Sequence, residues 1–71
     1  MEKLKYSNIE KERIKLGLSV TELSKKVGIC SKTYYNWIKG DTPIPSDKLI
    51  LLSKICNASI DYLLGIKKRA L

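Results

Sequence analysis

The sequence predicts an all-α protein, a compact domain of five helices. Start and stop signals for helices recur along the 71 residues, whereas no alternating strand pattern, repeat or low-complexity segment occurs. The length lies near the lower limit for an unaided hydrophobic core and leaves room for four or five helices and little else. We therefore expect one domain over residues 1–71, with its core over about 8–65.

The first predicted helix spans residues 8–16, with Ser7 or Asn8 as its cap. Gly17 ends it. Residues 1–7 carry charges but no clear cap, so we expect a frayed arm.

The second helix has the strongest start signal. Ser19 and Glu22 have the spacing of a capping box, which predicts a helix over residues 20–27, and Gly28 stops it. A third helix follows over residues 31–39 after a short turn. Two short helices joined by a turn of three to four residues have the geometry of helix-turn-helix.

The last two helices follow a loop that one glycine and two prolines keep non-helical. Ser46 is expected to cap a fourth helix that runs to Cys56, and Ser59 a short fifth helix over residues 60–64. Each has an aspartate in its first turn, where the helix dipole favours it. Residues 66–71 form a basic tail.

The inward faces of these helices predict a single core. Trp37 lies three residues after Tyr34, so both can face inward from the third helix. The expected core residues are Ile9, Leu16, Leu18, Leu23, Val27, Ile29, Tyr34, Trp37, Ile44, Leu49, Leu52, Cys56, Ile60, Leu63 and Leu64.

The fourth helix is more apolar than one buried face requires. Leu51 and Ile55 are four residues apart and hence neighbours beside the inward stripe. Either the N-terminal arm or the fifth helix covers them, or they belong to a subunit interface.

The composition is strongly basic. Fourteen Lys and Arg against seven Asp and Glu give a net charge of +7. Excess lysine can simply solvate a surface, but a pI of about 9.6 is also typical of a nucleic-acid-binding domain. No stretch approaches a membrane span and no signal peptide opens the chain, so we expect a cytoplasmic protein without membrane contact.

Catalytic and metal sites lack their usual residues. The chain has no histidine, no C-x-x-C pair, no evident nucleophile with a base and no phosphate-cradling glycine loop. We expect no enzyme, metal or cofactor, and no small-molecule effector is evident. Cys30 and Cys56 are expected to be reduced packing residues.

Several segments resemble the Cro/CI-type helix-turn-helix family, the phage-repressor-like group also called XRE. They are R-I-K-L-G-L-S-V-T-E-L-S-K-K-V-G, W-I-K-G, P-S-D-K-L and S-I-D-Y-L-L-G, in the right order across residues 9–65. The resemblance implies a DNA-binding domain, usually a homodimer on a palindromic operator and usually a transcriptional repressor. An antitoxin-like or oligomerising module, whose main partner is another protein, is the alternative.

Two departures from the family pattern concern helix starts. Val20 replaces a glutamine that often anchors a phosphate. Cys30 replaces the usual Ser or Thr cap, and Ser31 is expected to take that role.

A third departure concerns the third helix. Ile38 stands where relatives often have a glutamate that pairs with the arginine of the first helix, here Arg13. Arg13 is therefore left to Glu22, Asp41 or solvent.

The third helix is expected to enter the major groove, with phosphates at the amino end of the second helix and just after the third. The expected base-contacting residues are Ser31, Lys32, Tyr35 and Asn36. The expected phosphate-contacting residues are Thr21, Lys39, Gly40 and Thr42. The expected homodimer interface is Leu51, Ile55, Tyr62 and Ile66.

Overall fold

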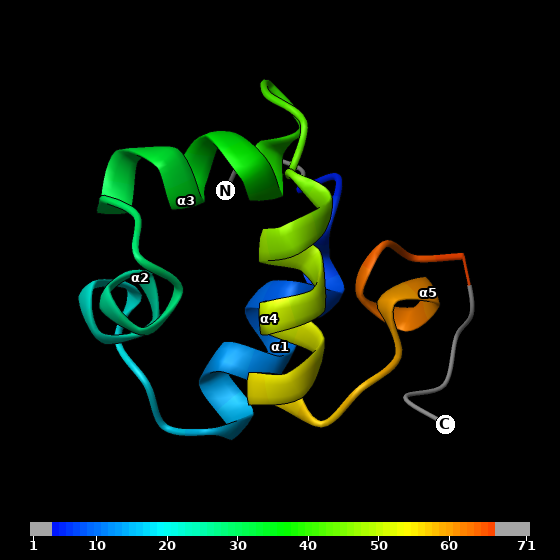
Figure 1. The fold of residues 1–71 in the computed structure, drawn as a ribbon, viewed down its shortest axis with the longest axis horizontal. Helices are drawn as coiled ribbons and strands as arrows, with labels where there is room; N and C mark the ends of the chain where they lie inside the picture. The colour runs from blue at the N-terminus through cyan, green and yellow to red at the C-terminus, as the bar shows by residue number, and fades with distance from the viewer. Residues whose placement is uncertain (1–3, 67–71) are drawn as a thin grey trace.

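The structure is a computed structural model that describes residues 4–66. Every regular element in this range is helical, which confirms the predicted all-α class (Figure 1). The helices are α1 (Ser7–Lys15), α2 (Val20–Val27), α3 (Ser31–Lys39), α4 (Ser46–Cys56) and α5 (Ile60–Leu63). Within the described range, no helix is long and apolar enough to cross a membrane. The ends of the predicted arm and tail, residues 1–3 and 67–71, lie outside the described residues.

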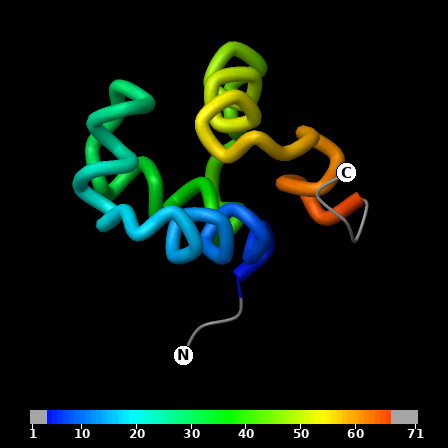
Figure 2. Tube along the Cα trace, turned by 90° about the horizontal axis from the view of Figure 1, so that it is seen from below, coloured from blue at the N-terminus to red at the C-terminus, as the bar shows by residue number. Residues whose placement is uncertain are grey.

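The helices surround one core. α1 contacts α3 and α5, α2 contacts α3 and α4, and α4 contacts α5. Figure 1 shows α3 lying across the top of the molecule, with α2 below one end of it and α4 running down from the other. In Figure 2 α4 is seen nearly end-on, and α2 and α5 lie on opposite sides of it. This arrangement leaves one long side of α3 at the surface.

The predicted capping box of α2 is confirmed. The Glu22 N–H donates to Ser19 Oγ at 3.0 Å, and the Ser19 N–H donates to Glu22 Oε1 at 2.8 Å. Gly28 closes the helix with φ 83°, a left-handed conformation that costs glycine little. Ser59 also caps α5 as predicted, because its Oγ accepts from the Tyr62 N–H at 3.1 Å.

The other predicted caps are wrong. The N-cap positions of α1 and α4 are Tyr6 and Pro45, neither of which makes a side-chain cap bond, and Ser7 and Ser46 are already helical. Glu10, three residues after Ser7, cannot complete a reciprocal pair because Arg13 and Tyr34 bind its carboxylate, and Ser46 has no acid three residues on. α1 also ends at Lys15, one residue before the predicted end.

The predicted fraying of the arm is wrong from Leu4 onward. Leu4 and Tyr6 are half-buried and pack against the core. The Tyr6 N–H donates to the Ile38 carbonyl at 3.0 Å, which ties the arm to α3. The Lys5 side chain occupies the space that a Cβ on Gly40 would need. The arm is thus held by apolar burial and by one backbone bond.

The core is close to the predicted one. Eight expected residues are buried, and they are Ile9, Leu23, Val27, Tyr34, Trp37, Leu52, Cys56 and Leu63. Half-buried residues from the prediction that pack against them are Leu18, Ile29 and Ile44.

Some core positions differ from the prediction. The prediction of a buried Leu16 is wrong: the residue is 44% exposed because α1 ends before it and the chain turns outward. Leu49, Ile60 and Leu64 are only half-buried. Ala58, absent from the prediction, is buried at the α4–α5 turn.

Candidate nucleic-acid interface

The two sides of α3 are divided as the sequence predicts. Tyr34, Trp37 and Ile38 are buried against the core. On the opposite side Lys32 is exposed and Tyr35 is 47% exposed, while Ser31 and Asn36 are half-buried at its edges. The four expected base-contacting residues therefore share the outer side of the helix.

The outer side of α3 is positively charged and carries polar groups without a partner among the described residues. α3 contains Lys32 and Lys39 and no acidic residue. Over residues 4–66, the side chains of Ser31, Lys32 and Asn36 make no hydrogen bond or ion pair. Such groups remain available for hydrogen bonds to base edges.

The amino end of α2 is a second candidate contact. Thr21 is exposed in its first turn. The capping box uses the N–H groups of Ser19 and Glu22, and leaves those of Val20 and Thr21 for an external acceptor. Helix N-termini attract anions such as phosphate, and the phosphate contact of Thr21 stays a prediction.

The turn after α3 places the other expected phosphate contacts. Gly40 adopts φ 84°, and the N–H groups of Asp41 and Thr42 donate to the Asn36 carbonyl at 2.9 and 3.4 Å. Thr42 is exposed. The Lys39 Nζ lies 3.5 Å from Asp41 Oδ2, and this partly exposed pair has little strength.

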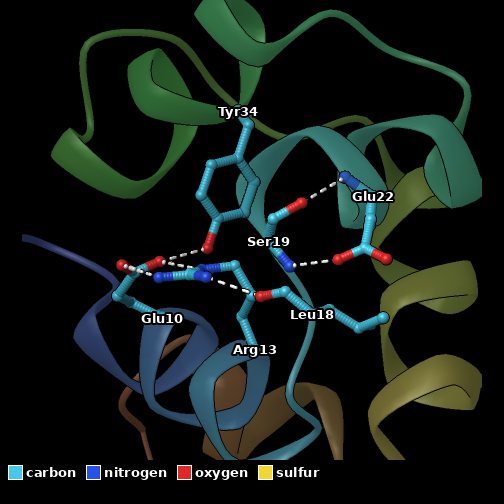
Figure 3. Close-up of polar contacts among 6 residues, drawn as sticks. All are labelled: Glu10, Arg13, Leu18, Ser19, Glu22 and Tyr34. Atoms are coloured by element: carbon cyan, nitrogen blue, oxygen red, sulfur yellow. Dashed lines mark hydrogen bonds and ion pairs between the residues drawn. The ribbon is translucent and has the colours of Figure 1, made fainter.

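A polar network joins α1 to α3 beneath this surface (Figure 3). Arg13 donates twice to Glu10, from Nε to Oε1 at 2.9 Å and from Nη2 to Oε2 at 2.7 Å. Its Nη1 donates to the Leu18 carbonyl at 2.6 Å. The Tyr34 hydroxyl donates to Glu10 Oε1 at 2.6 Å. The network thereby holds α1, the loop before α2, and α3 together.

The prediction for Arg13 is wrong, because its side chain binds neither Glu22 nor Asp41 and does not face solvent. The partner is Glu10 on the same helix, and sequence reasoning missed it although an i, i+3 pair of opposite charge is a recognised signal. The Arg13 hydrogen bonds lower the pKa of Glu10, and burial together with the Glu10 contact raises the pKa of Tyr34. Glu10 is therefore an ionised acceptor between two donors.

Cys30, directly before α3, does not meet its expectations. It is the N-cap residue, so Ser31 does not take that role, and its side chain makes no cap bond. Cys30 is exposed, whereas Cys56 is buried as expected of a packing residue. The Cys30 Sγ lies 3.3 Å from Thr33 Oγ1, and that hydrogen bond lowers the pKa of the Cys30 thiol.

Lys48 is a further residue that sequence reasoning missed. Its Nζ donates to the Val27 carbonyl at 2.9 Å, at the carboxyl end of α2. A cation is favourable at that end of a helix. α4 thus supports the turn between α2 and α3.

The expected dimer residues lie in two different environments. Leu51 and Ile55 are half-buried and pack against the core of their own chain. Tyr62 is half-buried too, and its hydroxyl donates to Glu12 Oε2 at 3.1 Å. Ile66 is 71% exposed.

Comparison with known proteins agrees with this geometry. A family model described as helix-turn-helix matches residues 9–63. A relative from Bacillus subtilis (strain 168), named "Uncharacterized HTH-type transcriptional regulator YobD", is 33% identical over 49 residues, 69% of this chain. The match covers 44% of that relative, so the chain spans less than half of its length. The chain belongs to the Cro/CI-type helix-turn-helix family of DNA-binding domains.

Proposed function

We propose that this domain is a sequence-specific transcriptional repressor that reads double-stranded DNA with α3. The observation that carries the proposal is the outer side of α3, where the side chains of Ser31, Lys32 and Asn36 make no hydrogen bond or ion pair within residues 4–66. The inner side is held to α1 by the Tyr34 hydroxyl. The Lys32 ammonium can donate hydrogen bonds to guanine O6 and N7, and the Asn36 amide can pair with the donor and the acceptor on the major-groove edge of adenine. The role is one of binding, not of catalysis.

The phosphate contacts proposed for Thr21, Lys39, Gly40 and Thr42 lie at the ends of α2 and α3 that flank the reading side. Contacts of this kind position a protein on the duplex without reading its sequence. The net charge of +7 supports a large electrostatic contribution and hence a steep salt dependence.

We propose further that two copies bind a palindromic operator as a homodimer. The domain measures 28 × 23 × 23 Å, so two copies whose α3 helices lie about 34 Å apart, one DNA turn, would touch only along an edge. α5 lies on the far side of α4 from α2 (Figure 2), which makes Tyr62 and Ile66 suitable for such an edge. Leu51 and Ile55 can add only the part of their surface that the core leaves uncovered.

Base readout is tested by first selecting a preferred duplex from a random library. Lys32→Ala and Asn36→Ala should each cost about 1–3 kcal/mol on that duplex and much less on random DNA. Lys54→Ala, which removes an exposed lysine from α4, is the matched control. Equal losses on both duplexes would show that Lys32 and Asn36 do not read bases.

Phosphate binding is tested through salt. Lys39→Ala should weaken binding to all sequences alike and reduce the salt slope by about one unit. An unchanged slope would place Lys39 away from phosphate.

Dimerisation is tested by analytical ultracentrifugation with and without the selected duplex. Ile66→Glu is the variant of choice, because Ile66 is exposed and the change leaves the core intact, unlike changes at Leu51 or Ile55. We expect a loss of two-copy complexes. A variant that still occupies the palindrome as two copies with unchanged affinity would place the interface elsewhere.

A further inference from the structure

A groove lies between α1 and α3, directly beside the reading side of α3. Its volume is about 400 Å³, and side chains from both helices and from the arm line it. This α1–α3 groove is lined by Leu4, Ser7, Glu10, Lys11, Ile14, Tyr35, Ile38 and Lys39.

The lining of the groove is apolar where it is most accessible. Ile14 is 63% exposed and Tyr35 47% exposed, and both belong to the same groove. Leu4 and Ile38 contribute the covered part of its lining. Single exposed apolar residues are ordinary, whereas their convergence in one concave surface marks a binding site.

The rim of the groove is positively charged. Lys11 is exposed on α1 and Lys39 lies at the end of α3. Among the lining residues that the structure describes, Glu10 is the one carboxylate, and Arg13 and Tyr34 already bind both of its oxygens. Within residues 4–66, the one ion pair of Lys39 is with the exposed Asp41 at 3.5 Å, which an incoming carboxylate can displace at little cost. The groove therefore complements an acidic ligand.

We propose that the α1–α3 groove docks a short acidic amphipathic helix from a partner protein. Apolar side chains one turn apart would enter between Ile14 and Tyr35, and flanking carboxylates would lie beside Lys11 and Lys39, the pattern of helix-in-groove recognition. A volume at the low end of the range for ligand pockets suits two or three such side chains.

The proposal rests in one respect on the proposed function, because Tyr35 and Lys39 also belong to the DNA surface. The docked helix and DNA would compete for these residues, so each would weaken the other by the same factor. The partner would thereby release the domain from DNA.

The experiment uses a fluorescent peptide of about 15 residues, long enough for some helix in isolation, with leucine at helical spacing and glutamate between. Two further probes are a scrambled peptide of equal composition and a version with lysine for glutamate. Binding is measured by anisotropy without DNA, and contact residues by amide chemical shifts.

Two variants remove the groove's apolar and charged features without touching the DNA surface, Ile14→Ser and Lys11→Glu. Matched controls on α4 are Ile50→Ser, at a residue 49% exposed, and Lys54→Glu. We expect the groove variants to weaken the acidic peptide about tenfold or more and the controls less than about twofold. Shifts should cluster at Ile14, Tyr35 and Ile38.

Several outcomes would overturn the proposal. Equal binding of the scrambled peptide would show simple attraction to a basic protein, and preferential binding of the lysine peptide would reverse the charge argument. Groove and control variants that behave alike would place binding elsewhere. A lower sedimentation mass for Ile14→Ser would make the groove a contact between copies of this chain.

Competition is measured last, with a labelled random-sequence duplex. The acidic peptide should displace the duplex from the wild type and not from Lys11→Glu. Peptide binding in a protein that binds no duplex would remove the proposed function and leave the docking site, while duplex binding without peptide binding would do the reverse.

Discussion

Helix α1 is joined to α3 and to α5 by the same kind of contact, a tyrosine hydroxyl that donates to a glutamate of α1. The two joints differ in length and in the partners of the glutamate. On the α3 side the Tyr34 hydroxyl donates to Glu10 at 2.6 Å, and Arg13 neutralises that carboxylate. On the α5 side the Tyr62 hydroxyl donates to Glu12 at 3.1 Å, and no cation within residues 4–66 pairs with Glu12. The helix proposed to read DNA thus has the joint with the shorter hydrogen bond and the ion-paired carboxylate.

The α5 joint relies on additional neutral contacts. The Asn8 side-chain amide donates to the Tyr62 carbonyl at 2.8 Å, and Leu63 is fully buried. Both hydroxyls donate to a carboxylate, but only the Tyr34 bond belongs to a network in which an arginine also binds the carboxylate and the Leu18 carbonyl. The contact between α1 and α3 is therefore the more strongly held of the two. It sets the orientation of the reading side.

Removal of Arg13 should weaken the joint between α1 and α3 more than any other single change. Arg13→Ala leaves the half-buried Glu10 carboxylate with the Tyr34 hydroxyl alone and the Leu18 carbonyl without its donor. We expect a loss of about 2–3 kcal/mol in the free energy of unfolding, measured with urea. Lys15→Ala, which removes a cation from the same last turn of α1, should cost less than about 0.5 kcal/mol. Similar losses in both variants would mean that only the helix dipole matters.

The two tyrosines provide the matched comparison. Tyr34→Phe should lower the free energy of unfolding by about 2 kcal/mol and Tyr62→Phe by about 1 kcal/mol, because Tyr34 is fully buried and makes the shorter hydrogen bond, whereas Tyr62 is half-buried. Tyr34→Phe should also weaken binding to the selected duplex, whereas Tyr62→Phe should not. An equal or larger cost for Tyr62→Phe would contradict the proposed difference between the joints.

A smaller effect is expected from pH. The pKa of Glu10 is lowered in the folded protein by its Arg13 hydrogen bonds, so the unfolded chain binds the proton more readily. The stabilisation is then complete above the unfolded pKa of about 4.3 and is lost as pH falls through the folded value. Unfolding curves between pH 6 and about 2 should show this loss. Glu10→Gln should flatten the curve, and Glu22→Gln provides the comparison, since the pKa of Glu22 is also lowered.

The smallest effect concerns the start of α3. Cys30→Ser supplies the missing cap and should stabilise the domain by about 0.5–1 kcal/mol. Ser19→Ala, which removes the cap of α2, should destabilise it by about 1 kcal/mol. No gain from Cys30→Ser would indicate that the tertiary joint, and not the local cap, already determines how α3 begins.

Local signals in the sequence were reliable where several agreed. The reciprocal pair of Ser19 and Glu22 and the closing Gly28 predicted α2 correctly, because each satisfies its neighbours' backbone groups without help from the rest of the chain. A lone serine was a weaker guide: Ser59 caps α5, whereas Ser46 does not cap α4. The capping role depends on which backbone groups the tertiary contacts leave unpaired.

In the candidate site too, some features were predictable from local sequence and others were not. Helical periodicity alone predicted that Tyr34 and Trp37 face inward and that Lys32 and Tyr35 face outward. It did not reveal that Glu10 holds Arg13 and Tyr34 together, because the Tyr34 contact spans 24 residues of sequence. The α1–α3 groove was equally hidden, since Ile14 and Tyr35 have no relation in sequence that indicates a shared surface.

The sequence by itself determined the helices, their order and the outer side of α3, because backbone hydrogen bonding and helical spacing act over a few residues. The tertiary structure decided what lies around them. It folded the arm from Leu4 onward against α3, turned Leu16 to the surface, and packed Leu51 and Ile55 against their own core. These outcomes depend on apolar surface shared between distant segments, and burial of that kind is non-directional and carries no local signal.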